Sequence, residues 1–191
     1  MAALPIEKPR LMTVAEFLDW DGDRTDLLFD LVGGEPVAQA RPSPAHATIM
    51  ANIAYTAGMA LRDRPPCRVL TEVGLFKAYN HLTARGADAA ITCEPVSKDR
   101  KVHPSVVLEV LSPSNRAETM AKVTFYATLD SVQEIVLLDS EEPTAIVFRR
   151  SMGDGWADNP AEILAGLDAV LQLPSLGIEL PFRGIYRYVD L

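Results

Sequence analysis

The feature that most constrains this chain is a single carboxylate in an otherwise apolar stretch near its middle. Residues 105–111 read SVVLEVL, so Glu109 follows three apolar residues and precedes two more. A strand that is apolar on both faces is typical of the centre of a sheet. An ionised side chain is costly there unless it pairs with another charge or holds a metal ion. The stretch therefore predicts a central strand with a polar site around Glu109.

A second isolated acid, Asp88, lies in the neighbouring predicted strand, residues 87–92 (ADAAIT), among small residues that let another group approach closely. Two acids on adjacent buried strands offer the carboxylate oxygens that Mg²⁺ prefers, with water completing its shell. For either acid alone, an ion pair with a buried arginine or a loop cap is the competing explanation. The two acids together, followed by a lysine on the next helix, favour a metal site.

That lysine is Lys122, on a helix predicted over residues 116–129. Tyr126 follows four residues later, so the two side chains point the same way. An amine near two carboxylates could orient a water molecule or stabilise negative charge on a phosphate oxygen. The alternatives are an ordinary surface lysine and a core tyrosine whose hydroxyl finds a partner. Arg116, at the helix start, is a candidate phosphate contact, with a solvated arginine as the alternative.

Strand and helix signals alternate along the chain without a strict βαβ rhythm. A capping box of Thr13 and Glu16 predicts a short helix that ends near Trp20, and apolar residues at four-residue steps predict a second helix from Ala45 to about Arg64. Strands are expected at residues 27–32, 36–40, 68–76, 87–92, 105–111, 134–138 and 144–149, with a hairpin turn at 152–155 and further segments at 171–180 and in the last residues. We predict one α/β domain over residues 1–191, a mixed sheet flanked by helices with a β-hairpin near the N-terminus.

Composition argues against several classes of protein. No apolar run approaches the ~18–20 residues of a membrane helix. The histidines His46, His81 and His103 have no zinc-type spacing. The two cysteines, Cys67 and Cys93, argue against a disulfide framework and fit small buried residues in a reducing cytoplasm.

The charge of the chain is acidic but uneven. Eighteen basic and 26 acidic residues give a net charge of −8, which opposes a general nucleic-acid coat. Residues 31–100 are the basic segment, with eight bases against six acids. A phosphate-binding face is expected there, with a solvated surface of mixed sign as the alternative.

Motifs in order along almost the whole chain resemble a family of small, mostly prokaryotic proteins known as putative restriction endonucleases, within the PD-(D/E)XK nuclease superfamily. The strongest match is LEVLSPS at residues 108–114, followed by KVTFYA at 122–127. Supporting matches lie at residues 13–18, 29–35, 43–46 and 87–91. The resemblance implies a restriction endonuclease-like fold that hydrolyses phosphodiester bonds of DNA with Mg²⁺ or Mn²⁺, leaving a 5′-phosphate.

The resemblance also implies roles for individual residues. Asp88, Glu109 and the backbone carbonyl of Val110 would hold the metal ion, with Asp30 as a candidate outer ligand, and Lys122 would be the catalytic lysine. The superfamily usually places this lysine two residues after the glutamate, where this chain has Leu111. Because Leu111 faces the same way as Glu109, a lysine arriving from the helix would fill nearly the same space. His46 would cap its helix or support the site, since Mg²⁺ prefers oxygen ligands.

Two other functions stay open. A non-catalytic binding or regulatory module with the nuclease fold is favoured by the acidic charge and by the absence of a base-reading motif. A hydrolase of small nucleotides is the other. A homodimer would bring two basic middle segments together and would help an acidic chain to bind DNA.

Overall fold

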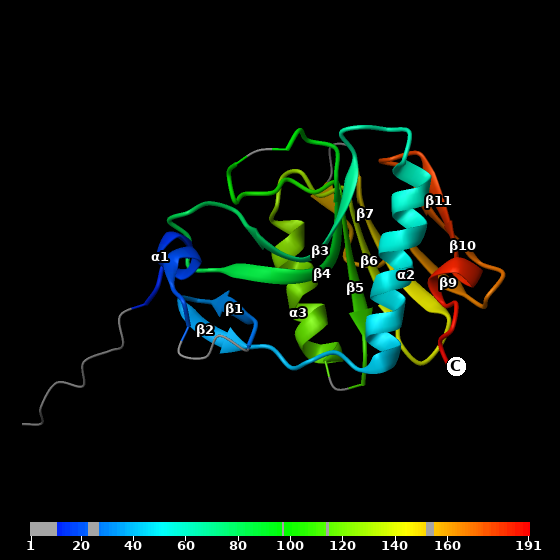
Figure 1. Cartoon of the computed structure of the whole chain (residues 1–191), viewed down its shortest axis with the longest axis horizontal. Coiled ribbons are helices and arrows are strands. Elements are labelled where there is room, and N and C mark those ends of the chain that lie inside the picture. The colour runs from blue at the N-terminus through cyan, green and yellow to red at the C-terminus, as the bar shows by residue number, and fades with distance from the viewer. Residues whose placement is uncertain (1–10, 23–26, 97, 114, 152–154) are drawn as a thin grey trace, which may run out of the picture.

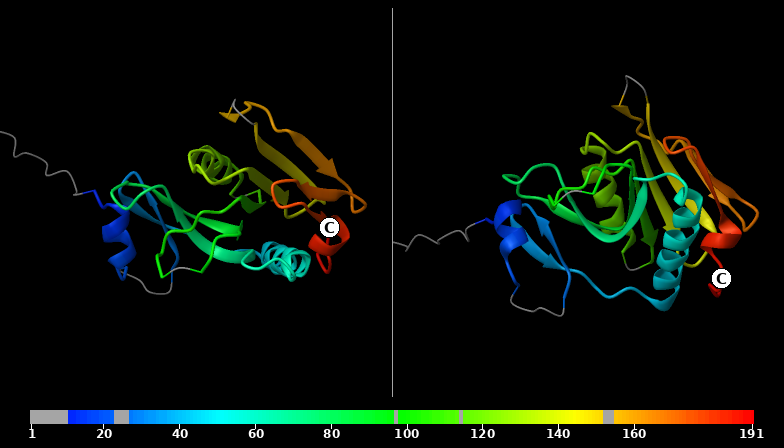
Figure 2. Two further views of the ribbon diagram at one scale, coloured as in Figure 1. Left: turned by 90° about the horizontal axis from the view of Figure 1, so that it is seen from above. Right: turned by 45° about the horizontal axis from the view of Figure 1, so that its top comes forward.

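Two helices cover opposite faces of a twisted sheet in the computed structural model, which describes residues 11–22, 27–96, 98–113, 115–151 and 155–191. Helix α2 (Pro44–Leu61) lies on one face and α3 (Arg116–Ala127) on the other (Figures 1 and 2). The short helix α1 (Val14–Asp19) and the β1–β2 hairpin lie at one end of the molecule, and the C-terminal segments lie at the other. This arrangement confirms the predicted mixed α/β fold with an N-terminal hairpin.

The main sheet has nine strands within the described residues, in the order β2-β1-β4-β5-β6-β7-β8, with β3 paired to β4 and β9 to β7. Strands β5 and β6 run parallel, and the other pairings of these strands are antiparallel. The strands are β1 (Phe29–Val32), β2 (Glu35–Ala38), β3 (Arg68–Phe76), β4 (Ala84–Thr92), β5 (Val106–Leu111), β6 (Glu134–Asp139), β7 (Thr144–Ser151), β8 (Gly155–Trp156) and β9 (Glu162–Ala165). A separate two-stranded sheet joins β10 (Val170–Leu173) to β11 (Ile178–Pro181).

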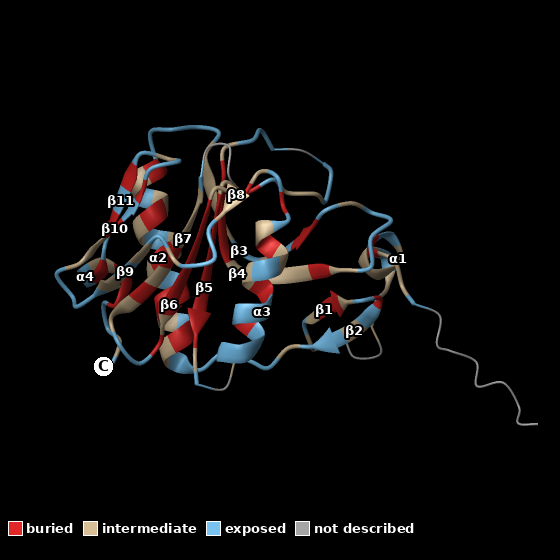
Figure 3. Cartoon of the chain, turned by 180° about the vertical axis from the view of Figure 1, so that it is seen from behind, coloured by how far each residue is buried: buried red, intermediate tan, exposed pale blue. Residues whose placement is uncertain are grey.

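Strand β5 lies at the centre of the main sheet, as its apolar sequence predicted, and all six of its residues are buried (Figure 3). The sheet has a core on each face. The predicted stripe of α2, which includes Ile49, Ile53 and Ala57, packs in one core. Tyr126 of α3 packs with Leu111 in the other. Glu109 therefore lies in the most enclosed part of the fold.

Local sequence signals placed most elements within a few residues. The capping box is present, with the Thr13 hydroxyl accepting from the Glu16 N–H and the Glu16 carboxylate accepting from the Thr13 N–H. Strand β4 starts at Ala84, three residues earlier than predicted, because its first residue pairs with Leu31 of the hairpin. The segment expected at 171–180 forms the two strands β10 and β11, the short helix α4 (Phe182–Ile185) follows in the last residues, and β9 was not predicted. Residues 152–154 of the predicted turn lie outside the described residues.

The two cysteines differ from the expectation of reduced, unpaired residues, because Cys67 and Cys93 form a disulfide. Cys67 precedes β3 and Cys93 follows β4, and the antiparallel pair Arg68 and Thr92 brings them opposite each other. The bridge closes the end of the β3–β4 ladder that is farther from the hairpin. Among the described residues, no helix is long and apolar enough to cross a membrane.

The disulfide makes a simple prediction about thiol content. Protein purified without reductant and unfolded in denaturant should react with no maleimide, and reduction should expose two thiols because both cysteines are in the bridge. Mass spectrometry after labelling measures the count. Two labels before reduction would contradict the pairing. Replacing both cysteines with serine should lower the free energy of unfolding by about 2–4 kcal/mol.

Candidate functional site

The two predicted acids lie at the point where β4 and β5 separate. Ala89 pairs with Leu108, and pairing continues toward the other end of β5 but not past this pair. Asp88 and Glu109 are the next residues along the two strands, so both carboxylates lie where the ladder opens. Like charges at opposed positions destabilise a sheet. In place of the ladder, the N–H of Val110 donates to Asp88 Oδ2 at 2.7 Å.

Glu109 is buried, with 1% of its surface exposed, and two side chains of α3 hold its carboxylate. The Lys122 ammonium lies 3.4 Å from Glu109 Oε2, and the Tyr126 hydroxyl donates to Oε1 at 2.5 Å. Both groups also donate to the carbonyl of Gly86 in β4, at 2.9 and 3.0 Å. The four-residue spacing on α3 thus gives two donors that together bind one carboxylate and one backbone carbonyl.

Burial has the largest effect on the pKa of the Glu109 carboxyl group. Removal of water, followed by the charge of Asp88, raises the pKa of Glu109 to about 8, although Lys122 and the Tyr126 hydroxyl act in the opposite direction. Burial, and then the charge of Glu109, raise the pKa of Tyr126 well above its ordinary value, so the phenol stays a donor. One lysine thus leaves the negative charge of the acid pair only partly compensated. A perturbed carboxylate in a cavity is typical of a functional site.

Helix α2 brings His46 to the other acid. Its Nε2 lies 3.2 Å from Asp88 Oδ2, and the histidine is 7% exposed. Ser43 caps α2 and accepts a hydrogen bond from the backbone N–H of His46 at 3.2 Å, which fixes the first turn of the helix. The structure therefore places the SPAH stretch at residues 43–46 beside Asp88, where His46 orients the carboxylate.

The Val110 carbonyl, predicted as a third ligand, has a partner within the chain. The Asn115 amide donates to it at 3.2 Å, while Asn115 Oδ1 accepts from the N–H of Ser112 at 2.7 Å. A carbonyl oxygen has two lone pairs, so this contact leaves one for another donor or a cation. Across the ranges that the structure describes, no cluster of three His, Cys, Asp or Glu side chains is arranged to hold a metal ion. A cation here would take two carboxylates, with the carbonyl and water as further ligands.

Asp30, the candidate outer ligand, joins the hairpin to β4. Its Oδ1 accepts from the Gly86 N–H at 2.6 Å and from the Gln39 amide at 2.5 Å, and its Oδ2 lies 3.2 Å from Arg85. Only 1% of Asp30 is exposed. A Cβ on residue 86 would lie 3.1 Å from the Gln39 amide and 3.4 Å from Asp30 Oδ1, so glycine lets these two side chains approach without displacement. The contacts of Asp30 fit a structural clamp that fixes Gly86, whose carbonyl binds Lys122 and Tyr126.

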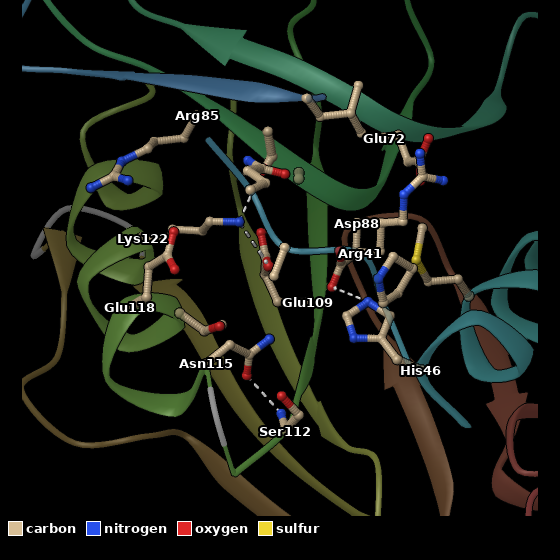
Figure 4. Close-up of a pocket in the computed structure, with 18 of the residues that line it drawn as sticks. Arg41, His46, Glu72, Arg85, Asp88, Glu109, Ser112, Asn115, Glu118 and Lys122 are labelled. Carbon is tan, nitrogen blue, oxygen red and sulfur yellow. Dashed lines mark hydrogen bonds and ion pairs between the residues drawn. The ribbon is translucent and has the colours of Figure 1, made fainter. Parts of the chain in front are cut away.

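A cavity of about 570 Å³ contains the site, and the side chains of Asp88, Glu109, Lys122 and His46 line it. Figure 4 shows Lys122 pointing toward Glu109, and His46 toward Asp88. The charged residues of its lining are three bases and five acids: Arg41, Arg85, Lys122, Glu72, Asp88, Glu109, Glu118 and Glu141. Arg116 is outside this lining and forms an ion pair with Asp139 at 2.5 Å.

Sequence reasoning missed Glu72 and Gln39, and it gave Arg85 only as one base of the basic segment 31–100. Glu72 lies opposite Asp88 in β3, between the pairs Thr71–Ala89 and Val73–Ala87, and has a φ of 48°. A positive φ is costly for a residue with a side chain and is concentrated at functional sites. Only the strand register reveals this position, since nothing in the local sequence marks it.

The pKa of Glu109 predicts how stability depends on pH without metal. Between the ordinary value and about 8, the folded chain keeps a proton that the unfolded chain has released. The free energy of unfolding should therefore fall as pH rises from 5 to 8, by ~1 kcal/mol per pH unit at most. Urea denaturation in chelator should show this slope in the wild type and a flatter one in Glu109→Gln. Glu179→Gln, at an exposed position, is the control. Equal slopes in all three proteins would contradict the raised pKa of Glu109.

The clamp predicts a stability effect for Asp30→Ala. The substitution leaves Arg85 and the Gly86 N–H without their carboxylate partner, so the free energy of unfolding should fall by about 3 kcal/mol. Asp30→Asn, which keeps the shape, should cost about half as much. Denaturant titration measures both. A loss below about 1 kcal/mol together with weakened metal binding would instead make Asp30 a ligand.

Comparisons with known proteins identify the family and the fold of this chain. The family model described as Uma2, putative restriction endonuclease, matches residues 14–183. A crystal structure described as a putative nuclease of DUF820 from Anabaena variabilis ATCC 29413 superposes with a TM-score of 0.73 at 17% identity, covering 94% of this chain and 99% of that one. No match is found among the curated proteins. Because the family match covers most of its length, the chain belongs to the Uma2 family of putative restriction endonucleases.

Proposed function

We propose that this chain is an endonuclease that hydrolyses phosphodiester bonds of DNA with Mg²⁺ or Mn²⁺. The observation that carries the proposal is the convergence of Asp88, Glu109 and Lys122, from β4, β5 and α3, on one cavity. Lys122 lies 3.4 Å from Glu109, and Asp88 is bound to the backbone next to it. Family membership supports this choice of chemistry.

The residues present fit a divalent cation of the hard, oxygen-binding kind. Asp88 and Glu109 supply adjacent carboxylates, and the Val110 carbonyl lies on the residue after Glu109. Burial, and then the charge of Asp88, raise the pKa of Glu109 to about 8, so a cation beside both carboxylates would favour the ionised form of Glu109. Two carboxylates with a carbonyl and water suit Mg²⁺ and Mn²⁺. When bound, the ion would supply Lewis acidity toward a phosphoryl oxygen and lower the pKa of a water molecule.

Side chains of the protein would orient the reacting groups and stabilise their charge. Lys122 has three N–H donors, and two of its contacts go to Gly86 and Glu109, so its ammonium can also donate to the attacking water or to a phosphoryl oxygen. Attack of water on phosphorus would break the bond to the 3′-oxygen, which takes a proton and leaves as a hydroxyl. Tyr126 and His46 would act indirectly, because they hold Glu109 and Asp88 in place.

The second candidate function is a non-catalytic binding module, which the negative charge of the chain and of its cavity favours. The chain has a net charge of −8, and the cavity lining has five acids against three bases, which opposes tight binding of a polyanion without a bound cation. A module of this kind would retain the Glu109–Lys122–Tyr126 contacts as structure alone. Loss of activity in site variants with unchanged folding separates the two functions.

Plasmid nicking tests the proposal. In Mg²⁺ or Mn²⁺ the wild type should convert supercoiled plasmid to open circles, and chelator should stop the reaction. Glu109→Gln and Lys122→Ala should each lower the rate about 100-fold or more, because each removes charge that stabilises the reacting groups.

Matched controls are available on the exposed surface. Glu179→Gln and Lys98→Ala make the same chemical changes away from the cavity and should cleave like the wild type. Circular dichroism should show that all four variants are folded. Cleavage that persists unchanged in Glu109→Gln and Lys122→Ala would point to a contaminating nuclease and refute the proposal.

A further inference from the structure

The cavity continues from the acids to an aromatic end formed by α1 and the hairpin. Phe17 of α1 and Phe29 of β1 line that end with the 57% exposed Leu28, and both rings are half-buried. Trp20 supports them from behind the lining, with ring centroids 6.1 Å from Phe17 and 5.1 Å from Phe29. In Figure 1, α1 and the hairpin lie beside the start of β4, the strand that continues to Asp88.

A single cavity is therefore lined at one end by apolar and aromatic side chains and at the other by the groups proposed to cleave a phosphodiester. Its volume of about 570 Å³ lies in the range of ~300–1,000 Å³ typical of small-molecule sites. The faces of paired bases are covered by their stacked neighbours in a duplex, so an aromatic wall inside a cavity can stack only on an unpaired or flipped base.

The charge of the cavity also favours a nucleic acid with unpaired bases. Five acids against three bases give the lining little attraction for phosphate unless a cation is bound. A contact that does not need positive charge would therefore add affinity for a nucleic acid. Stacking of bases on aromatic side chains is such a contact and is tolerant of sequence.

We infer that the substrate is a single strand, or an unpaired segment, whose base enters the aromatic end while its phosphodiester lies at Asp88, Glu109 and Lys122. This inference rests on the proposed function and names its substrate class. Arg85 also lines this cavity, and its guanidinium pairs with Asp30 of the hairpin at 3.2 Å.

Fluorescence anisotropy with labelled oligonucleotides tests the inference. The full chain carrying Glu109→Gln, which should not cleave, is titrated in Mg²⁺ with dT12, rU12 and a 12-base-pair duplex. At least one single strand should bind about tenfold more tightly than the duplex, and dT12 against rU12 identifies the sugar. Phe29→Leu, which keeps apolar bulk but removes the ring face, should weaken single-strand binding about tenfold and leave duplex binding unchanged.

Further variants keep the test decisive if Phe29→Leu is poorly folded. Leu28→Trp adds a ring to an exposed position of the lining and should tighten single-strand binding. Tyr55→Ala removes a 69% exposed aromatic ring outside the cavity and should have no effect. Binding to single strands should also weaken only slightly with salt.

The outcomes distinguish this inference from the proposed function. Equal or tighter binding of duplex, no binding to any strand, or indifference to both Phe29→Leu and Leu28→Trp would overturn the inference. Wild type that nicks duplex but shows no single-strand preference would retain the nuclease and refute the substrate class. Tight single-strand binding by a wild type that never cleaves would support the stacking site and refute the nuclease.

Discussion

The structure depends on how one buried carboxylate is compensated. Glu109 lies in a strand whose six residues are all buried, and neither water nor the sheet ladder can stabilise its charge. Lys122 and Tyr126 do so from one helix, and both also bind the carbonyl of Gly86. These contacts join α3 to β4 and β5 at the point where the two strands separate. Because a buried donor or acceptor left without a partner costs about 1–3 kcal/mol, the contacts restrict where the helix can lie.

The hairpin takes part in the same arrangement from the other side. Asp30 binds the Gly86 N–H while Lys122 and Tyr126 bind its carbonyl, so one glycine links the hairpin to the proposed catalytic groups. That link has a functional consequence. Phe29, at the aromatic end of the cavity, precedes Asp30 in β1, so the contact of Asp30 with Gly86 ties that end to β4. The proposed base-binding end and the proposed catalytic groups are thus joined through Gly86.

Local sequence patterns predicted the helices and strands whose formation depends on residues close together in the chain. The apolar run around Glu109 predicted a central strand, the Thr13–Glu16 pair predicted α1, and the two-residue glycine turn predicted the hairpin. The pairing of Lys122 with Glu109 followed from spacing on a helix together with family resemblance. What escaped prediction depends on long-range register. Glu72 opposite Asp88, Asp30 beneath Gly86, and the Cys67–Cys93 bridge are all set by which strands pair, and no short segment encodes that choice.

The central claim is that two acids from separate strands form a cation site beside a helix lysine. The most direct measurement is an anomalous difference map from crystals soaked in Mn²⁺. One strong peak is expected within bonding distance of carboxylate oxygens from both Asp88 and Glu109. A map with no peak there, or with a peak that touches neither carboxylate, would contradict the claim.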